Sequence, residues 1–404
     1  MFTPSEALAR VLERIPGPSG REEVPLAEAR GRCLAAPAVS DVDLPPFEKS
    51  MMDGFALASA EAASAPVRLH VRGESRAGRP FSGRVGTGEC VEIFTGAELP
   101  RECDAVEMVE HTRRPAEAPA AVELTRPVKS GQNVAHRGEI LRVGQEVYAP
   151  RRRLSAADLS VLASIGCEPV SVFPRPRVSV LTTGDELVPA SHKPERGQIR
   201  EGNTLFLAAA CAALGCTVVR SGIVPDDPAQ LERAFREALE DSDVLVTTGG
   251  VSVGKYDLVG AAFEKLGVEP ILHKVAVKPG KPIWFGMRDR TPVFGLPGNP
   301  VSALLGFEVF VRAALVRLCG DAPELEAERL RLARWNGREE RGADRQNHLP
   351  ARLSLGKDGV EELEPLRFLG SADIVAAARA DALAIVPPGG AIRPRELVQY
   401  RPLS

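Results

Sequence analysis

The chain contains 404 residues, of which 44% are hydrophobic and 26% are charged, and its formal net charge at pH 7 is −3. This length predicts two to four domains, and the charge excludes the strongly basic composition that is typical of nucleic-acid-binding proteins. We find neither an apolar run long enough to span a bilayer nor a signal-peptide pattern. We therefore expect no nucleic-acid partner, no membrane partner and a cytoplasmic location.

The cysteines and histidines do not indicate a metal centre. The seven cysteines are scattered and form no Cys-x-x-Cys pair, and the six histidines are equally dispersed. We therefore expect reduced cytosolic thiols, with neither a zinc site nor a disulfide framework.

Two helices are predicted at the start of the chain. Thr3, Pro4 and Glu6 have the pattern of a capping box with proline at the first helical position, and Gly17 ends this helix. Residues 24–34 predict a second helix.

The helical period disappears between residues 67 and 134. Short β-like runs alternate there with glycine, proline and charged residues, which predicts a small β domain. The predicted strands lie at 69–72, 90–95, 105–110 and 121–125. A capping pattern at Ser155 and Asp158 then predicts a helix to Ile165. We interpret residues 51–136 as a β domain inserted into an N-terminal helical and β region, which comprises residues 1–50 and 137–174.

Strands and helices alternate regularly between residues 175 and 322. The predicted strands cover 178–183, 217–222, 243–248 and 292–296, and the helices that follow them cover 204–214, 229–240, 258–266 and 300–318. Asn203, Asp227 and Asn299 stand where they would cap three of these helices. The alternation predicts a central three-layer α/β domain with a mostly parallel sheet. Residues 323–404 predict a C-terminal β domain, so the expected fold class is α/β multidomain.

Three polar loops follow strands of this central domain. The first contains Thr183 and Gly184, the second contains Gly249 and Gly250, and the third is the segment 297–302. The carboxyl ends of parallel strands meet at one edge of a sheet, so we expect the loops to converge there. Glycine-rich loops present backbone N–H groups to anions. Taken alone, the double-glycine loop could equally be a tight turn without a ligand.

Charged residues accompany these loops. Lys278 and Lys281 flank a stiff Pro-Gly turn, and Glu186, Asp226 and Asp257 lie near strand ends. Carboxylates suit Mg²⁺ and lysines neutralise oxyanions, so the set suits a phosphate-bearing ligand with a divalent cation. The alternative role for each acid is a helix cap or a solvated loop residue. That alternative is strongest for Asp226, since the next two residues already begin a helix.

Seven motifs stand in an order that resembles one family. They are Pro45-Pro46-Phe47-Glu48-Lys49-Ser50-Met51-Met52-Asp53-Gly54-Phe55-Ala56, Phe94-Thr95-Gly96-Ala97, Gly131-Gln132-Asn133-Val134, Thr183-Gly184-Asp185-Glu186-Leu187, Gly249-Gly250-Val251-Ser252-Val253-Gly254, Lys278-Pro279-Gly280-Lys281-Pro282 and Gly295-Leu296-Pro297-Gly298-Asn299-Pro300-Val301-Ser302. The chain resembles the molybdopterin molybdenumtransferases, the bacterial MoeA family that is similar to the E domain of gephyrin. The resemblance covers about residues 3 to 400.

The resemblance implies a reaction and a set of site residues. Molybdate and adenylylated molybdopterin would give molybdenum cofactor and AMP in the presence of Mg²⁺. The implied catalytic residues are Asp53, Thr95, Glu186, Asp257, Lys274, Lys278 and Lys281. The implied substrate-binding residues are Thr183, Gly184, Gly249, Gly250, Ser252, Gly254, Pro297, Gly298, Asn299, Ser302 and Ser371. The implied metal ligands are Glu186, Asp226 and Asp257.

The resemblance also implies an assembly. Asp53 and Thr95 fall in a different domain from the other candidates, so we expect a homodimer whose subunits share each active site. A molybdopterin adenylyltransferase is a possible further partner. Two departures from the family pattern concern the site: Ile140 replaces a second acid after Glu139, and Asn347 replaces an arginine, with Arg345 two residues earlier.

Two other functions fit parts of the sequence. An inactive dimeric scaffold, similar to the E domain of gephyrin, would need the same fold but would not need Asp257, Lys278 and Lys281. A molybdopterin adenylyltransferase would share the central domain and its double-glycine loop, but it would lack the N-terminal and C-terminal domains.

Overall fold

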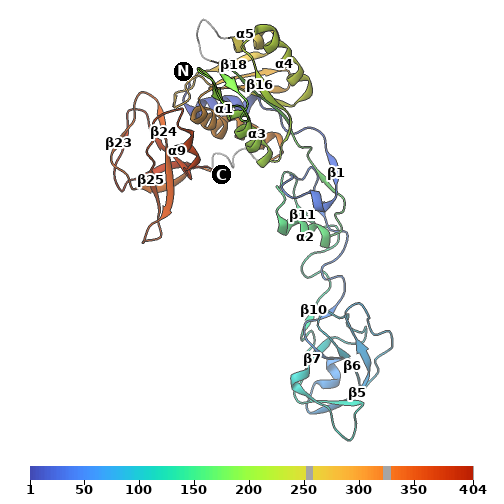
Figure 1. The fold of residues 1–404 in the computed structure, drawn as a ribbon. Coiled ribbons are helices and arrows are strands. Elements are labelled where there is room, and N and C mark those ends of the chain that lie inside the picture. Colours follow the sequence, from blue (N-terminus) through green and yellow to red (C-terminus); the bar gives the residue numbers. More distant parts are fainter. Residues whose placement is uncertain (252–257, 322–328, 404) are drawn as a thin grey trace.

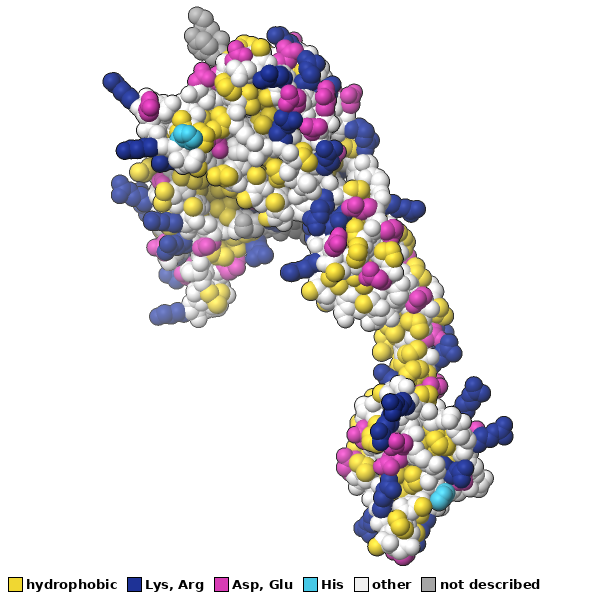
Figure 2. Space-filling view, turned by 45° about the vertical axis from the view of Figure 1, so that its right-hand side comes forward, with side chains coloured by type: hydrophobic (Ala, Val, Ile, Leu, Met, Phe, Trp, Pro, Cys, Tyr) yellow, Lys and Arg dark blue, Asp and Glu magenta, His cyan; other side chains and the backbone are white. Residues whose placement is uncertain are grey.

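The structure is a computed structural model that describes residues 1–251, 258–321 and 329–403. The chain is elongated, with the central α/β part and the C-terminal sheets at one end and the inserted β domain at the other (Figure 1). A narrow region that contains β1 and α2 separates them. On the face shown in Figure 2, basic and acidic side chains are interspersed, as the small net charge suggests.

The inserted domain is built on a six-stranded sheet with the order β7-β4-β6-β5-β9-β8. The four predicted strands are confirmed, and β4 and β8 were not predicted. Its elements are β4 (Gly54–Leu57), η2 (Ser59–Ala62), β5 (Val67–Ser75), β6 (Glu89–Ile93), β7 (Ala105–Met108), η3 (Val109–His111), β8 (Thr112–Arg113) and β9 (Ala121–Leu124). Phe55, Leu69 and Leu124 are among the buried side chains that hold this sheet together.

The N-terminal region contains one of its two predicted early helices. In α1 (Pro4–Arg14) the Thr3 hydroxyl accepts from the Glu6 N–H at 3.3 Å, and the Glu6 carboxylate accepts from the Thr3 N–H, so the capping box is confirmed. The helix predicted at residues 24–34 is wrong. Pro25 and Gly31, which has a φ of +74°, interrupt it, and only η1 (Leu26–Glu28) forms.

Short antiparallel pairings complete this narrow region. In these pairings β1 (Glu22–Val24) pairs with β12 (Val170–Val172), β2 (Ala38–Val39) pairs with β11 (Glu146–Tyr148), and β3 (Lys49–Ser50) pairs with β10 (Val134–Ala135). The helix predicted after Ser155 is confirmed as α2 (Ala156–Ser164), which is capped by that serine.

The central sheet has six strands in the order β16-β13-β17-β21-β20-β18. The four predicted strands are parallel and appear as β13 (Arg177–Thr183), β16 (Thr217–Val224), β17 (Val244–Thr248) and β21 (Thr291–Leu296). An antiparallel pair, β18 (Glu269–His273) and β20 (Trp284–Arg288), extends one side. That pair was not predicted. A small parallel ribbon of β14 (Leu187–Val188) and β15 (Ile199–Arg200) lies beside the sheet.

Helices cover both faces of the central sheet. They are α3 (Asn203–Ala213), α4 (Pro228–Asp241), α5 (Leu258–Lys265), α6 (Pro300–Gly306), η4 (Phe307–Val311) and α7 (Arg312–Leu318). The predicted helix 300–318 therefore forms, but its middle turn, η4, is π-helical. Together with the mostly parallel sheet, these helices confirm the predicted fold class.

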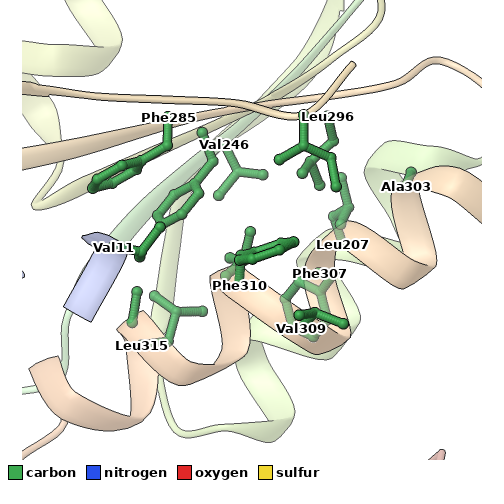
Figure 3. Close-up of a cluster of buried hydrophobic side chains, with 14 of the residues drawn as sticks. Val11, Leu207, Val246, Phe285, Leu296, Ala303, Phe307, Val309, Phe310 and Leu315 are labelled. Carbon is green, nitrogen blue, oxygen red and sulfur yellow. The ribbon is translucent and has the colours of Figure 1, made fainter. Parts of the chain in front are cut away.

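Two clusters of buried side chains, one on each face of the central sheet, hold the sheet between two layers of helices. Val244 and Val246 of β17 join a cluster that includes Val11, Leu207 and Phe310, so α1, α3 and the helices after β21 pack on one face (Figure 3). Leu245 lies between them in sequence and joins a second cluster with α4 and α5. Alternate residues of a strand point to opposite faces, and this buried strand therefore supplies both cores.

The C-terminal region is mainly β, as predicted. Its larger sheet has the order β19-β24-β25-β22-β28-β26, and the central segment contributes β19 (Val277–Lys278) to it. The other elements are β22 (Arg331–Trp335), β23 (Glu340–Arg341), β24 (Gln346–Leu355), β25 (Glu361–Pro365), α9 (Ile374–Ala378), β26 (Ala382–Val386), β27 (Ala391–Ile392) and β28 (Leu397–Pro402). Trp335 and Tyr400 are fully buried in its core.

Candidate substrate-binding site

A cavity of about 600 Å³ lies at the carboxyl ends of the parallel strands of the central sheet. The three loops predicted to converge all line it, through Thr183 and Gly184, Gly249 and Gly250, and Gly298 and Asn299. The strand register explains why, because β17 pairs with β13 on one side and with β21 on the other. The loops that follow these three strands are therefore neighbours at the sheet edge.

Two adjacent positions in the second loop require glycine. Gly249 and Gly250 have φ values of +92° and +63°, a region that residues with a side chain rarely adopt. A Cβ atom on Gly249 would lie 2.3 Å from the Thr183 carbonyl oxygen, and one on Gly250 would lie 2.4 Å from a Val259 methyl group. The loop therefore packs directly on the end of β13, and its backbone borders the cavity.

Asn203 connects two of the loops. Its side-chain amide donates to the Gly298 carbonyl at 2.8 Å and to the Thr248 hydroxyl at 3.2 Å. The Thr248 hydroxyl donates in turn to the Pro297 carbonyl at 2.9 Å. The prediction that Asn203 caps α3 is wrong, because Gly202 precedes the helix and this amide points across to the glycine loops.

The third loop also contacts the C-terminal region. Asn299 was predicted to cap α6, but its side chain forms no capping bond and donates to the Ser371 hydroxyl at 3.0 Å. The Val301 N–H donates to the Ser371 carbonyl at 3.0 Å. Ala372 and Ile374 beside this contact line the cavity. Pro297 and Ser302 are buried, so among the candidates of this loop Gly298 and Asn299 are the exposed ones.

Two of the candidate acids line the cavity, and a third acid lies beside one of them. Glu186 and Asp226 line it, and the Asp185 carboxylate accepts from the Asp226 N–H at 3.0 Å. Partial burial, followed by the negative charges of Asp185 and Glu186, raises the pKa of Asp226. Helix capping was the alternative role for Asp226, but the residue that caps α4 is Asp227, whose carboxylate accepts from the Gln230 N–H at 2.9 Å. Asp226 therefore remains an exposed acid at the cavity.

The three candidate lysines lie near the cavity loops but do not line the cavity itself. Lys278 and Lys281 are exposed, and within the described ranges neither forms an ion pair. A Cβ atom on Gly280, between them, would lie 3.5 Å from the Ser302 carbonyl, which places this turn against α6. Lys274 has a φ of +79° and donates its N–H to the Ile283 carbonyl, so it begins the same turn.

Asp53 and Thr95 form a separate centre in the inserted domain. The Asp53 carboxylate accepts from the N–H and from the hydroxyl of Thr95, both at 2.7 Å, and these bonds lower the pKa of Asp53. Their domain lies at the opposite end of the chain from α3 and the cavity (Figure 1). One chain therefore does not bring these two residues to the other candidates.

Some cavity residues were missed by sequence reasoning. Ile199, Arg200 and Phe206 line the cavity, together with Leu187 and Ile374. They come from the β14–β15 ribbon and from α3 and α9, and the short ribbon strands gave no periodic signal. Arg200 is held by its Nε, which donates to the Ala190 and His192 carbonyls at 3.1 and 2.9 Å.

The two departures from the family pattern have different surroundings. Ile140 is 71% exposed in the narrow region. Asn347 lies opposite Lys278 in the β19–β24 pairing, and Arg345 donates to the Val277 carbonyl at 3.2 Å. Arg345 immediately precedes β24 and contacts the residue before Lys278 through its side chain.

Three candidates, Ser252, Gly254 and Asp257, lie outside the described residues. In the ranges that are described, no group of three or more histidine, cysteine or acidic residues is arranged to hold a metal ion. No helix in those ranges is long and apolar enough to cross a membrane.

Three family models match the chain in sequence. Residues 2–166 match the MoeA N-terminal region (domains I and II), residues 179–317 match a probable molybdopterin-binding domain, and residues 333–403 match the MoeA C-terminal region (domain IV).

Curated proteins and solved structures agree with these matches. The chain is 36% identical over 320 residues to the molybdopterin molybdenumtransferase of Haemophilus influenzae, covering 79% of this chain and 78% of that protein. It is 33% identical over 376 residues to the enzyme of the same name from a Nostoc species, covering 91% and 85%. A molybdopterin biosynthesis MoeA protein from Pyrococcus horikoshii has a TM-score of 0.85 and 30% identity, covering 99% of this chain and 98% of that chain.

Proposed function

This chain belongs to the MoeA family of molybdopterin molybdenumtransferases, and we propose that it transfers molybdenum from molybdate to adenylylated molybdopterin with release of AMP. In this reaction the phosphoanhydride of the nucleotide is cleaved, and dithiolene sulfurs replace oxygens of molybdate. The observation that carries the proposal is the cavity at the sheet edge, where three glycine-containing loops and two candidate acids meet.

The lining of the cavity contains two chemically different groups of residues. Gly249, Gly250 and Gly298 belong to loops whose backbone N–H groups suit phosphate oxygens. Leu187, Ile199 and Phe206 supply apolar surface that suits a planar ring. We therefore assign the phosphates of the substrate to the glycine loops and one of its rings to the apolar residues.

We assign a divalent cation to the acidic residues beside the cavity. Asp185, Glu186 and Asp226 repel one another, which contributes to the raised pKa of Asp226, and a bound cation would relieve this repulsion. Glu186 and Asp226, with Asp257, are the proposed Mg²⁺ ligands. When bound, Mg²⁺ would neutralise charge on the phosphate oxygens. The residues of the chain would hold the phosphates in line for cleavage.

Molybdate binding is assigned to the lysine turn. Molybdate carries two negative charges and must lie near an anionic phosphate, which is costly without adjacent cations. Lys278 and Lys281 are exposed on a turn that packs against α6, and Ser371 hydrogen-bonds Asn299 on the third loop. These residues supply positive charge and a hydroxyl donor for an oxyanion.

We further propose that the active site is shared between the subunits of a homodimer. Asp53 and Thr95 lie far along the chain from the cavity. A second copy could place Asp53 of the partner subunit at the cavity, while each cavity remains on its own chain. Supply of the nucleotide by a molybdopterin adenylyltransferase and a cytoplasmic location complete the proposal.

An AMP-release assay tests the proposed function. The purified chain is incubated with adenylylated molybdopterin, with and without molybdate and Mg²⁺, and AMP is measured by chromatography. We expect release that requires both additions and that stops when the cation is chelated. Binding of the nucleotide without release under any condition would indicate an inactive scaffold, whereas formation of the adenylylated substrate from ATP would indicate an adenylyltransferase.

A further inference from the structure

Two neighbouring thiols lie away from the cavity. Cys216 is located between α3 and β16, Cys319 follows the last residue of α7, and their sulfur atoms are 3.9 Å apart. Their side chains are only 6% and 8% exposed. The two positions are 103 residues apart in the sequence, so folding is needed to bring the thiols together. The scattered spacing of the cysteines gave no sign of this pair.

Cys319 is the more acidic thiol of the two. A hydrogen bond from Cys216 and the positive charge of Arg153 lower the pKa of Cys319, although burial acts in the opposite direction. The same contact and burial raise the pKa of Cys216. Arg153 is held in place by Asp321, at 2.7 Å, and by the Gly31 carbonyl, at 2.8 Å. The thiolate is the reactive form of cysteine, and Cys319, unlike Cys216, also lines a small crevice. Cys319 would therefore react first.

A small crevice leads to Cys319. Its volume is about 10 Å³, and its lining includes Gly31, Cys33, Phe173, Leu214, Gly215 and Cys319. Such a volume holds about one water-sized molecule. Hydrogen peroxide has only two heavy atoms, whereas a peptide disulfide such as oxidised glutathione is far larger. The crevice therefore excludes large disulfide oxidants, and a small peroxide is the oxidant that we consider.

We propose that Cys216 and Cys319 are a site of reversible oxidation, at which hydrogen peroxide converts two thiols into one intramolecular disulfide. The Cys319 thiolate attacks one peroxide oxygen, so that an S–O bond forms, the O–O bond breaks and hydroxide leaves. The Cys216 sulfur then attacks the resulting sulfenic acid, so that the S–S bond forms and the second oxygen leaves as water. The two protons released from the thiols are consumed in forming the two water molecules.

The disulfide would protect the protein from irreversible damage. A sulfenic acid without a neighbouring thiol is oxidised further to sulfinic and sulfonic acids, whereas a disulfide is reduced again by thiols. The cross-link would also join the start of β16 to the end of α7 and close a long loop, which restricts the unfolded chain. We therefore expect the oxidised protein to unfold at a higher temperature than the reduced protein.

Thiol counting tests the proposal on the full-length chain. The reduced protein is treated with hydrogen peroxide, denatured, alkylated and analysed by mass spectrometry before and after digestion. We expect the loss of two of the seven thiols and a cross-linked peptide that contains Cys216 and Cys319, both reversed by dithiothreitol. An unchanged thiol count, or a disulfide from Cys319 to Cys33 in the same crevice, would overturn the proposal.

Serine variants test the order of the steps. In Cys216→Ser, Cys319 should stop at the sulfenic acid, which dimedone captures, and in Cys319→Ser the remaining Cys216 should stay reduced. Cys90→Ser removes another buried thiol, whose pKa burial raises to about 12, and should leave the disulfide unchanged. Dimedone capture at Cys216 in place of Cys319 would contradict the assignment, as would equally fast cross-linking by oxidised glutathione.

Discussion

The side-chain amide of Asn203 donates to the Gly298 carbonyl at 2.8 Å and so ties the first turn of α3 to the loop that follows β21. The same amide contacts Thr248, at the end of β17 and immediately before the double-glycine loop. Asn203 therefore sets the spacing between two of the loops that border the cavity. It is a positioning residue for the proposed phosphate contacts.

Asn203→Ala should weaken binding of the nucleotide and also destabilise the chain. Both hydrogen bonds lie within the protein, so their loss costs about 1 kcal/mol of folding stability each. If ordering the two freed loops then costs about 1–2 kcal/mol of binding energy, the Kd for AMP rises about five- to thirty-fold. Calorimetric titration with AMP and thermal unfolding would be measured in parallel. Asn336→Ala is a matched control, since it removes a side-chain hydrogen bond to Glu362 in the C-terminal region. Equal AMP affinity in the Asn203 variant and the parent would contradict this role.

Gly249→Ala should abolish turnover and destabilise the central domain. The left-handed φ alone costs about 1–2 kcal/mol for a residue with a Cβ atom, and here the added atom also overlaps the Thr183 carbonyl at 2.3 Å. Gly267→Ala is the control, because Gly267 has a φ of +73° and no atom within 4 Å of the added carbon. Thermal unfolding of both variants separates the cost of the left-handed φ, which both share, from the cost of the atomic overlap, which only Gly249→Ala has. Equal losses of stability would argue against a close approach of the loop to β13.

Lys281→Ala should raise the molybdate concentration needed for half-maximal rate, because one of the exposed cations assigned to the oxyanion is removed. Affinity for the nucleotide should change less, since that ligand has many other contacts. Lys281→Arg should restore little of the molybdate affinity, because a planar guanidinium does not match a compact ammonium on a tight turn. Lys265→Ala, on the surface of α5, serves as control. If nucleotide affinity falls and the molybdate dependence stays constant, the lysine turn binds phosphate.

Asp226→Asn should stabilise the chain at neutral pH. The pKa of Asp226 is raised in the folded chain, so its ionised form disfavours folding at pH values above its usual 3.8, and this penalty disappears as the pH falls below that value. The variant should therefore unfold at a higher temperature than the parent at neutral pH and at the same temperature in acid. Mg²⁺ should raise the unfolding temperature of the parent more than that of the variant. A variant less stable than its parent at neutral pH would contradict a net unfavourable effect of the Asp226 charge beside Asp185 and Glu186.

Mixed dimers test the shared site. Asp53→Ala and Glu186→Ala chains should each be inactive, and a mixture of them should regain part of the activity, since one kind of site then contains neither change. Heterodimer formation would be verified with two different affinity tags. If verified heterodimers regain no activity, the two residues either act in one site of the same chain or one of them takes no part in the reaction. Either outcome would contradict the shared site.

The central domain was the most predictable part of the fold. Three of its predicted strands, β13, β17 and β21, are buried apolar runs, and Asp227 caps α4 as predicted. Local sequence is sufficient to locate these elements. The helix expected at 24–34 failed because Pro25 and Gly31 outweigh its alanine and arginine content. The antiparallel pair β18 and β20 was missed because its two short runs pair with each other and with β21 only in the folded sheet.

The site was predictable to the extent that its residues stand in loops after strands. Thr183, Gly249 and Gly298 were found in this way, and they line one cavity. Phe206 and Arg200 were missed because their contribution depends on how α3 and the β14–β15 ribbon turn toward the cavity. The side chains of Asn203 and Asn299 were assigned to helix caps, yet both make tertiary hydrogen bonds that local sequence does not reveal.

The most direct test of the proposed function compares two products in a single turnover. The chain, in excess over adenylylated molybdopterin, is mixed with molybdate and Mg²⁺, and both AMP and the molybdenum cofactor are quantified, the latter by activation of a cofactor-free molybdenum enzyme. We predict one AMP for each cofactor formed, and neither product when molybdate is omitted. AMP release that is independent of molybdate, or without active cofactor, would contradict the proposal that this chain is a molybdenum-inserting enzyme.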